Sequence, residues 1–124
     1  MRKKIELEYI FSSSLNVLFS RLSTTMGLSE WFADEVQQAG STFIFTWNGT
    51  KSRARLLELK RNISVKFRWE DASDDEYFEF LLEVDALTAE VALIITDFTD
   101  EDDEDSTIEL WDKQIDILHR VIGA

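Results

Sequence analysis

The last stretch of the chain, residues 106–122, has apolar residues at the spacing of an α-helix. These residues fall on one side of a helical wheel: Ile108, Leu110, Trp111, Ile115, Ile117, Leu118, Val121 and Ile122. The apolar arc spans roughly 160°, so the helix requires a large apolar partner. Ser106 followed by Glu109 has the spacing of a capping box, which predicts that the helix begins at Ser106.

Upstream of this helix, apolar and polar residues alternate with period two, which is typical of strands with one buried face. The alternation predicts strands at residues 3–11, 34–38, 41–47, 50–60, 63–69, 77–84 and 89–97. Segment 34–38 has the weakest pattern. Asn48 and Gly49 predict a tight hairpin turn, because both residues tolerate a positive φ. In the last strand Ala92 and Ile94 make the second face apolar too, which indicates burial on both sides or a sticky outer face.

Two short helices are predicted between the first strand and the rest. Serine hydroxyls at residues 12–14 can cap a helix start, and apolar residues then follow at helical spacing as far as Leu22. Residues 24–27 are expected to break this helix. Residues 28–33, which include Trp31 and Phe32, are long enough for one further turn.

The order of elements predicts the fold. Hairpin connections make the sheet antiparallel, and a long sheet that covers a single helix must curl around it. We therefore predict an α+β helix-grip fold, with a curved antiparallel sheet of about seven strands wrapped around the C-terminal helix. At this length, residues 1–124 are expected to form one domain. A curved sheet and one helix seldom close completely, so we expect a cavity between them.

Composition narrows the classes of partner. The chain has 25 acidic and 13 basic residues and a formal charge of −12, which repels nucleic acid and anionic membranes. Much of the acid lies in residues 71–76 and 97–105, where we expect solvated loops. Cys is absent, and no apolar run approaches the ~18 residues of a membrane span. The start of the chain alternates apolar residues with Glu6 and Glu8, unlike a signal peptide, so we expect a cytoplasmic protein.

Four motifs resemble a known family. They are LSEWFA at residues 28–33, GSTFIFTWNG at 40–49, VKFRWE at 65–70 and WDKQIDILHR at 111–120. Together with the element order they resemble the START-like, or birch-pollen-allergen-like (SRPBCC), superfamily, and within it the branch related to the activator of heat shock protein 90 ATPase. The resemblance implies a helix-grip fold and a role as hydrophobic-ligand carrier, polyketide cyclase or chaperone-binding domain. It implies no catalytic motif, metal or cofactor, and the acidic insert before the last helix departs from the family pattern.

The candidate ligand-binding residues are mainly aromatic and are expected between sheet and helix, with Trp31 and Phe32 at the mouth. They are Trp31, Phe32, Phe43, Phe45, Trp47, Phe67, Trp69, Phe80, Trp111, Gln114, Ile115 and Leu118. These side chains are enough to line an apolar pocket and also enough to fill it, and the sequence leaves both open. Gln114 lies inside the apolar arc, where an unpaired amide costs on the order of 1–3 kcal/mol. It is either a polar anchor for a ligand or hydrogen-bonded to a strand backbone or to water.

Other polar residues favour structural roles. His119, the only histidine, is expected on the rim of the polar side of the helix. The acidic residues 97–104 alternate like a calcium loop but lack its glycine and final acid, so a solvated loop is favoured. Arg53, Arg55 and Arg68 could hold a ligand carboxylate if they faced inward. Outward pairing with Glu79 or Glu83 is favoured for them.

These patterns favour a non-enzymatic domain that binds a small hydrophobic or amphipathic ligand. The alternative, which the resemblance implies, is an interaction module: a chaperone-associated domain or a homodimer that uses the outer face of Ala92 and Ile94. A cyclase-like enzyme is the weakest alternative, because Tyr9 and Gln114 are among the few inward polar groups.

Overall fold

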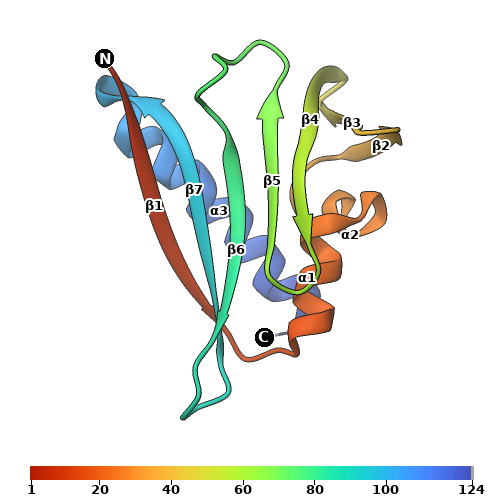
Figure 1. The fold of residues 1–124 in the computed structure, drawn as a ribbon, viewed down its shortest axis with the longest axis vertical. Coiled ribbons are helices and arrows are strands. Elements are labelled where there is room, and N and C mark those ends of the chain that lie inside the picture. Colours follow the sequence, from red (N-terminus) through yellow and green to blue (C-terminus); the bar gives the residue numbers. More distant parts are fainter. Residues whose placement is uncertain (124) are drawn as a thin grey trace.

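A computed structural model describes residues 1–123 (Figure 1). The elements follow in the order β1 (Arg2–Phe11), α1 (Leu15–Ser23), α2 (Thr25–Ser29), β2 (Glu35–Ala39), β3 (Thr42–Trp47), β4 (Thr50–Lys60), β5 (Ser64–Trp69), β6 (Phe78–Val84), β7 (Val91–Asp100), η1 (Glu101–Asp103) and α3 (Glu104–Ile122). The seven strands form one antiparallel sheet in the order β1-β7-β6-β5-β4-β3-β2, which is not closed into a barrel. The sheet curves around α3, which crosses behind it in Figure 1, so the predicted helix-grip fold is confirmed.

Local sequence explains the hairpins and the bend of the sheet. Asn48 and Gly49 have φ values of 49° and 81° between β3 and β4, so the predicted tight turn is confirmed. Asn62 supplies a second positive φ, 61°, between β4 and β5. The pairing of β4 with β5 shifts register between Leu56 and Glu58, and such an irregularity increases local strand twist.

The core fills the space between sheet and helix. Inward-facing phenylalanines of β3, β5 and β6 pack edge to face or stacked, with ring centroids 5.1 Å apart for Phe43–Phe67 and for Phe67–Phe78. From α3, the buried residues Trp111, Ile115 and Leu118 close this core. Leu110, Ile117 and Val121 were expected to extend the buried face of α3, but they are exposed. The buried stripe of α3 is therefore narrower than the predicted arc.

The second short helix begins earlier than predicted. Residues 24–27 were expected to break the first short helix and to precede the second, but α2 starts at Thr25 because the Thr24 hydroxyl accepts a hydrogen bond of 2.9 Å from the Gly27 main-chain N–H. A Cβ on Gly27 would lie 2.2 Å from the Ser20 carbonyl oxygen, so this glycine permits close packing of α2 on α1. Trp31 lies in the turn after α2, not in a helix.

The acidic residues before α3 are structured, which corrects two predictions. The strand β7 continues to Asp100, paired with Arg2 of β1, so residues 97–105 form a strand end, η1 and a helix start instead of a solvated loop. The helix begins at Glu104, and the predicted capping box is absent because the Ser106 hydroxyl donates to the Asp103 carbonyl. Acidic residues at the start of α3 favour this helix through its dipole. Lys3 of β1 also pairs with Glu104 at 2.8 Å.

None of the helices in residues 1–123 combines the length and apolar composition that a membrane span requires.

Candidate functional site

An open groove of about 860 Å³ lies between α3 and the turn that follows α2, and we call it the α3 groove. The groove is lined by the end of α2 and the turn that follows it, by one residue each of β3, β5 and β7, and by α3. The lining residues are Ser29, Glu30, Trp31, Phe32, Ala33, Asp34, Trp47, Trp69, Asp97, Thr107, Leu110, Trp111, Lys113, Gln114 and Ile117. All four tryptophans of the chain contribute to it. The groove is therefore the place where the aromatic residues of distant segments meet solvent.

The main-chain carbonyl of Phe32 holds the groove together. It accepts a hydrogen bond of 2.8 Å from the Trp47 indole N–H of β3 and one of 3.0 Å from the Gln114 amide of α3. The Phe32 ring also contacts the rings of Trp31, Trp47 and Trp111, with centroids 5.4, 5.3 and 5.8 Å away. One residue of the turn thus fixes the sheet and the long helix relative to each other.

The Gln114 side chain is hydrogen-bonded to main chain and also lines the groove. Its amide nitrogen donates to a main-chain carbonyl, that of Phe32, in a turn instead of a strand. The same side chain lines the α3 groove. The amide is therefore held in a fixed position at the groove wall.

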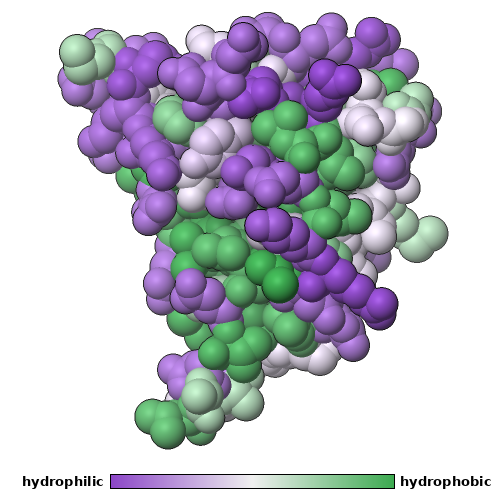
Figure 2. Space-filling view, in the orientation of Figure 1, coloured by the Kyte–Doolittle hydropathy of each residue, from purple (hydrophilic) through white to green (hydrophobic). Residues whose placement is uncertain are grey.

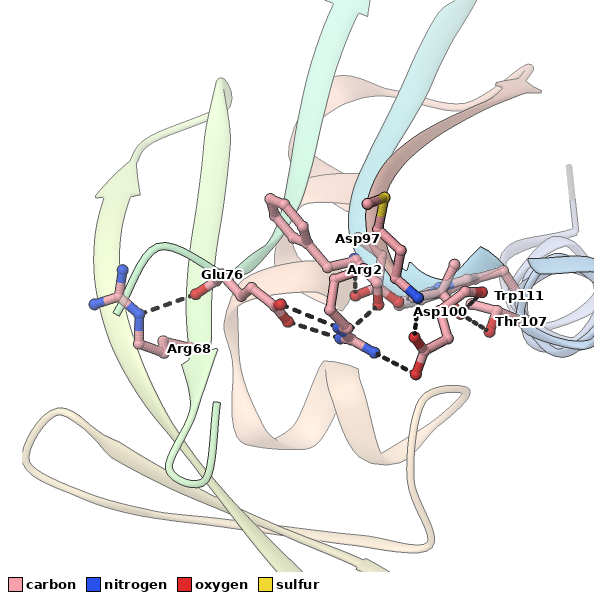
Figure 3. A network of polar contacts seen from close by, with 10 residues as sticks. Arg2, Arg68, Glu76, Asp97, Asp100, Thr107 and Trp111 are labelled. Atoms are coloured by element: carbon pink, nitrogen blue, oxygen red, sulfur yellow. Dashed lines mark hydrogen bonds and ion pairs between the residues drawn. The ribbon is translucent and has the colours of Figure 1, made fainter. Parts of the chain in front are cut away.

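Asp97 is a groove residue that the sequence analysis missed. It follows Leu93 and Ile95 on the inward face of β7, and one carboxylate oxygen accepts a hydrogen bond of 2.9 Å from the Trp111 indole N–H. The other accepts one of 2.8 Å from the main-chain N–H of Phe98. Burial raises the pKa of Asp97, and these two donors and the positive charge of Arg2 oppose the rise. Figure 3 shows this network at the end of the sheet.

The alternation of side chains along β7 could have identified Asp97 as an inward-facing residue, because it continues the series Leu93 and Ile95. The predicted strand ended at this residue, so its acidity was ascribed to a loop. Pairing of Ile5 with Asp97 continues the ladder past this point and keeps the carboxylate on the inner face.

The residues predicted to bind a ligand divide into two groups. Trp31, Phe32, Trp47, Trp69, Trp111 and Gln114 line the α3 groove. The others, each at most 1% exposed, lie in the adjoining core: Phe43, Phe45, Phe67, Phe80, Ile115 and Leu118. The interior is thus packed where the sequence left open a cavity, and the accessible space lies beside it.

Two apolar side chains of α3 also belong to the groove. Leu110 is 59% exposed and Ile117 37% exposed, and both line its wall. Sequence analysis placed them on the flank of the buried arc. Their exposure next to the tryptophans leaves an unfilled apolar surface.

His119 and the arginines lie away from the groove. The His119 ring stacks on Phe11 with centroids 3.9 Å apart, and its Nε2 is 2.9 Å from the Ile10 carbonyl oxygen. This is the structural role that the sequence favoured. Within residues 1–123, no group of three or more His, Asp or Glu side chains is placed to hold a metal ion.

The predicted pairing of Arg68 is wrong. Its Nε donates to the Glu76 carbonyl at 2.9 Å, whereas Lys66 lies 2.9 Å from Glu58 and 4.0 Å from Glu79. Lys66 stands directly opposite Glu79 in the β5–β6 ladder, so its side chain is nearer to Glu79 than that of Arg68 is. Arg53 and Arg55 are exposed, and neither forms an ion pair within the part of the chain that the structure describes.

A family model for the START-like superfamily domain matches residues 1–124. The chain belongs to the START-like superfamily. A Bacteroides fragilis protein whose structure was determined by solution NMR is 36% identical to this START-like domain, with a TM-score of 0.69; the match covers 97% of this chain and 90% of that chain. No curated protein matches.

Two more distant structures share the fold of this START-like domain. The Aha1 dimer from Colwellia psychrerythraea is 18% identical with a TM-score of 0.74, over 97% of this chain and 93% of that one. CalU16 from Micromonospora echinospora is 14% identical with a TM-score of 0.76, over 98% of this chain and 76% of that one. The family model confirms the superfamily resemblance inferred from the four motifs, and the structural neighbours include an Aha1 dimer.

Proposed function

We propose that this START-like domain binds a small hydrophobic or amphipathic ligand in the α3 groove and does not act as an enzyme. The observation that carries the proposal is the unfilled apolar surface of Leu110 and Ile117 beside the tryptophans, in a groove of about 860 Å³. Small-molecule sites in proteins commonly measure roughly 300–1,000 Å³ and are mainly apolar with a few placed polar groups. The groove has this composition.

Apolar burial supplies the affinity in this proposal. Each Å² removed from water contributes about 25 cal/mol, so a ligand that covers the exposed wall of α3 gains from every methylene in contact. Gln114 and Asp97 fix its orientation, because each is already held by hydrogen bonds and needs no reorganisation on binding. In this proposal the polar groups determine which ligand is accepted and how it is oriented, and the apolar wall supplies most of the affinity.

The polar chemistry of the groove favours binding over catalysis. Asp97 is engaged by two donors, and His119 is engaged at the opposite side of α3, against β1. General acid–base catalysis needs a titratable group free to reach a reacting atom. The Asp97 carboxylate serves better as a fixed recognition group.

Tryptophan fluorescence tests this proposal, because all four tryptophans line the groove. We expect hydrophobic dyes and alkyl compounds to change the emission in a saturable way. The variant Leu110→Glu should weaken binding by about tenfold, since a charge would enter the apolar wall. Leu87→Glu is the matched control, because Leu87 is 96% exposed in the β6–β7 turn. A silent protein, or equal binding by both variants, would contradict the proposal.

As a second candidate function, the domain forms a protein–protein contact through the outer face of the sheet. Ile94 stands between Glu8 of β1 and Leu81 of β6, and Ile10 stands opposite Ala92. Figure 2 shows apolar side chains gathered over the lower halves of β1, β7 and β6. One structural neighbour is an Aha1 dimer, which supports an interaction role.

Analytical sedimentation, which reports the oligomeric state, and a pull-down with heat shock protein 90 test this second function. A homodimer should dissociate in the variant Ile10→Lys, because Ile10 is 46% exposed within the outer apolar face. Val17→Lys, at an exposed apolar residue of α1, is the control. A monomer that captures no chaperone would contradict the interaction function and leave ligand binding standing.

A further inference from the structure

The charges that line the α3 groove do not balance. The lining includes the carboxylates of Glu30, Asp34 and Asp97 and one ammonium group, that of Lys113. Glu30 is paired with Arg21 of α1. Asp34 and Asp97 form no ion pair with any of residues 1–123.

The one basic residue in the groove lining, Lys113, is also paired with an opposite charge. Lys113 lies 3.4 Å from Glu109, one turn earlier on α3. The hollow next to the groove, on the far side of Trp47 and Trp69, carries two basic and two acidic residues: Lys51, Arg53, Glu70 and Asp71. Within residues 1–123, Glu30 and Lys113 are thus paired, and the groove lining keeps two carboxylates, those of Asp34 and Asp97, that have no ion-pair partner.

The unpaired carboxylates favour a positively charged ligand, and the aromatic lining favours the same charge. Trp47 and Trp69 are half-buried, with ring centroids 6.0 Å apart and planes tilted by 58°. Indole faces attract cations, and groups of aromatic rings with a carboxylate are a common arrangement for ammonium recognition. Tryptophans and carboxylates therefore line one groove, with exposed apolar residues on the helix beside them.

We propose that the ligand of the α3 groove is a cationic amphiphile: a primary or methylated ammonium group near Asp97, Asp34 and the tryptophans, with an apolar body along Leu110 and Ile117. This inference rests on the proposed ligand-binding function. A fatty carboxylate would place a second negative charge beside Asp97 in a protein of charge −12. A neutral ligand would cover Asp97 without pairing it, which carries a desolvation penalty.

The position of Asp97 suits this role. Two N–H donors hold its carboxylate in place, and a carboxylate has about four acceptor sites, so acceptor capacity remains for a ligand. Burial raises its pKa, and the positive charge of a bound cation would act against that rise. Asp34 is exposed at the groove, and among residues 1–123 its carboxylate accepts a hydrogen bond only from the main-chain N–H of Asn48, at 2.8 Å.

Three compounds with the same decyl chain test the inference: decyltrimethylammonium, decanol and decanoate. Each is titrated below its micelle concentration and followed by tryptophan fluorescence. We expect the ammonium compound to bind about tenfold more tightly than decanol, and decanoate to bind most weakly. Asp97→Asn and Asp34→Asn should each weaken binding of the ammonium compound and so reduce its preference. Decanol should bind these variants at least as tightly as the natural protein, because no carboxylate has to be desolvated, and its binding also shows that the groove remains folded.

The control variant separates a local effect from general attraction to an acidic protein. Glu83→Gln removes the same charge from an exposed position on β6, on the outer face of the sheet, and should keep the preference. Equal affinity for the three compounds, tighter binding of decanoate, or the same loss in Glu83→Gln as in Asp97→Asn would overturn the cationic assignment while ligand binding stands. Failure of all three compounds to bind would overturn both proposals.

Discussion

The side-chain amide of Gln114 donates a hydrogen bond of 3.0 Å to the main-chain carbonyl of Phe32, which lies 82 residues earlier in the chain. The same carbonyl accepts the Trp47 indole N–H at 2.8 Å. A turn that belongs to neither sheet nor helix therefore connects both. Because all three residues line the α3 groove, this connection fixes the shape of the candidate site.

Replacing Gln114 should cost stability and alter the groove. In Gln114→Ala we expect a loss of about 0.5–1.5 kcal/mol in the free energy of unfolding, the usual value of one partly buried hydrogen bond. Denaturation in urea measures it. Gln37→Ala, at an exposed position of β2, is the control and should change stability by much less. A loss no greater than that of Gln37→Ala would show that the bond to Phe32 contributes nothing.

Gly27 should tolerate no side chain. A Cβ at this position would lie 2.2 Å from the Ser20 carbonyl oxygen and 2.6 Å from the Arg21 Cα, so α1 and α2 must separate. We expect Gly27→Ala to destabilise the protein by about 1–3 kcal/mol, as other overpacked sites do. Thermal unfolding measures the effect. Met26→Ala, at a residue that is 77% exposed in the same helix, is the control; equal melting temperatures for the two variants would contradict the predicted clash.

Asp97 should make stability fall as pH rises through the acidic range. Burial raises its pKa in the folded protein, where Trp111 and Arg2 act against the rise and Glu76 adds to it. Between the ordinary and the raised pKa, the folded state binds more protons than the unfolded state, so ionisation of Asp97 opposes folding there.

The variant Asp97→Asn isolates this contribution. The free energy of unfolding of the natural protein minus that of Asp97→Asn should decrease with rising pH across the window and then level off. Urea denaturation of both proteins at a series of pH values measures it. A difference that grows with pH would show that the two hydrogen bonds outweigh burial.

Glu76 should give the opposite dependence. Arg2 of β1 donates two hydrogen bonds, of 2.7 and 3.0 Å, to its carboxylate, and these lower the pKa of Glu76 (Figure 3). A lowered pKa means that the pair stabilises the fold above the ordinary pKa of Glu and that this stabilisation is lost as pH falls.

The variant Glu76→Gln tests the pair. The natural protein should exceed Glu76→Gln in stability near neutral pH and lose that advantage toward low pH. The effect should be small, because the Arg2 side chain is half exposed and its charge is screened by salt. Glu8→Gln, at an exposed residue of β1, is the control. An advantage that is independent of pH would show that charge makes no contribution.

The groove shows which part of the candidate site the sequence could predict and which part it could not. Trp31, Trp47, Trp111 and Gln114 were predicted to surround a ligand, and they do line one open surface. The other half of the predicted set is packed in the core, because phenylalanines of β3, β5 and β6 meet one another with ring centroids about 5–6 Å apart and fill that space. Whether aromatic side chains line or fill a space depends on the curvature of the sheet, which no single strand determines.

Alternation of apolar and polar residues determined the strands and the face that each strand buries, since side-chain direction has a period of two wherever a strand forms. Asn48 and Gly49 determined the tight turn, because both residues tolerate a positive φ. Only the tertiary structure decided that β7 runs on to Asp100, that α3 begins before Ser106, and that Asp97 faces the groove. These outcomes depend on pairing with β1 and on contacts with α3. Partners far apart in the chain choose between alternatives that are locally almost equal in free energy, and a local pattern contains no record of that choice.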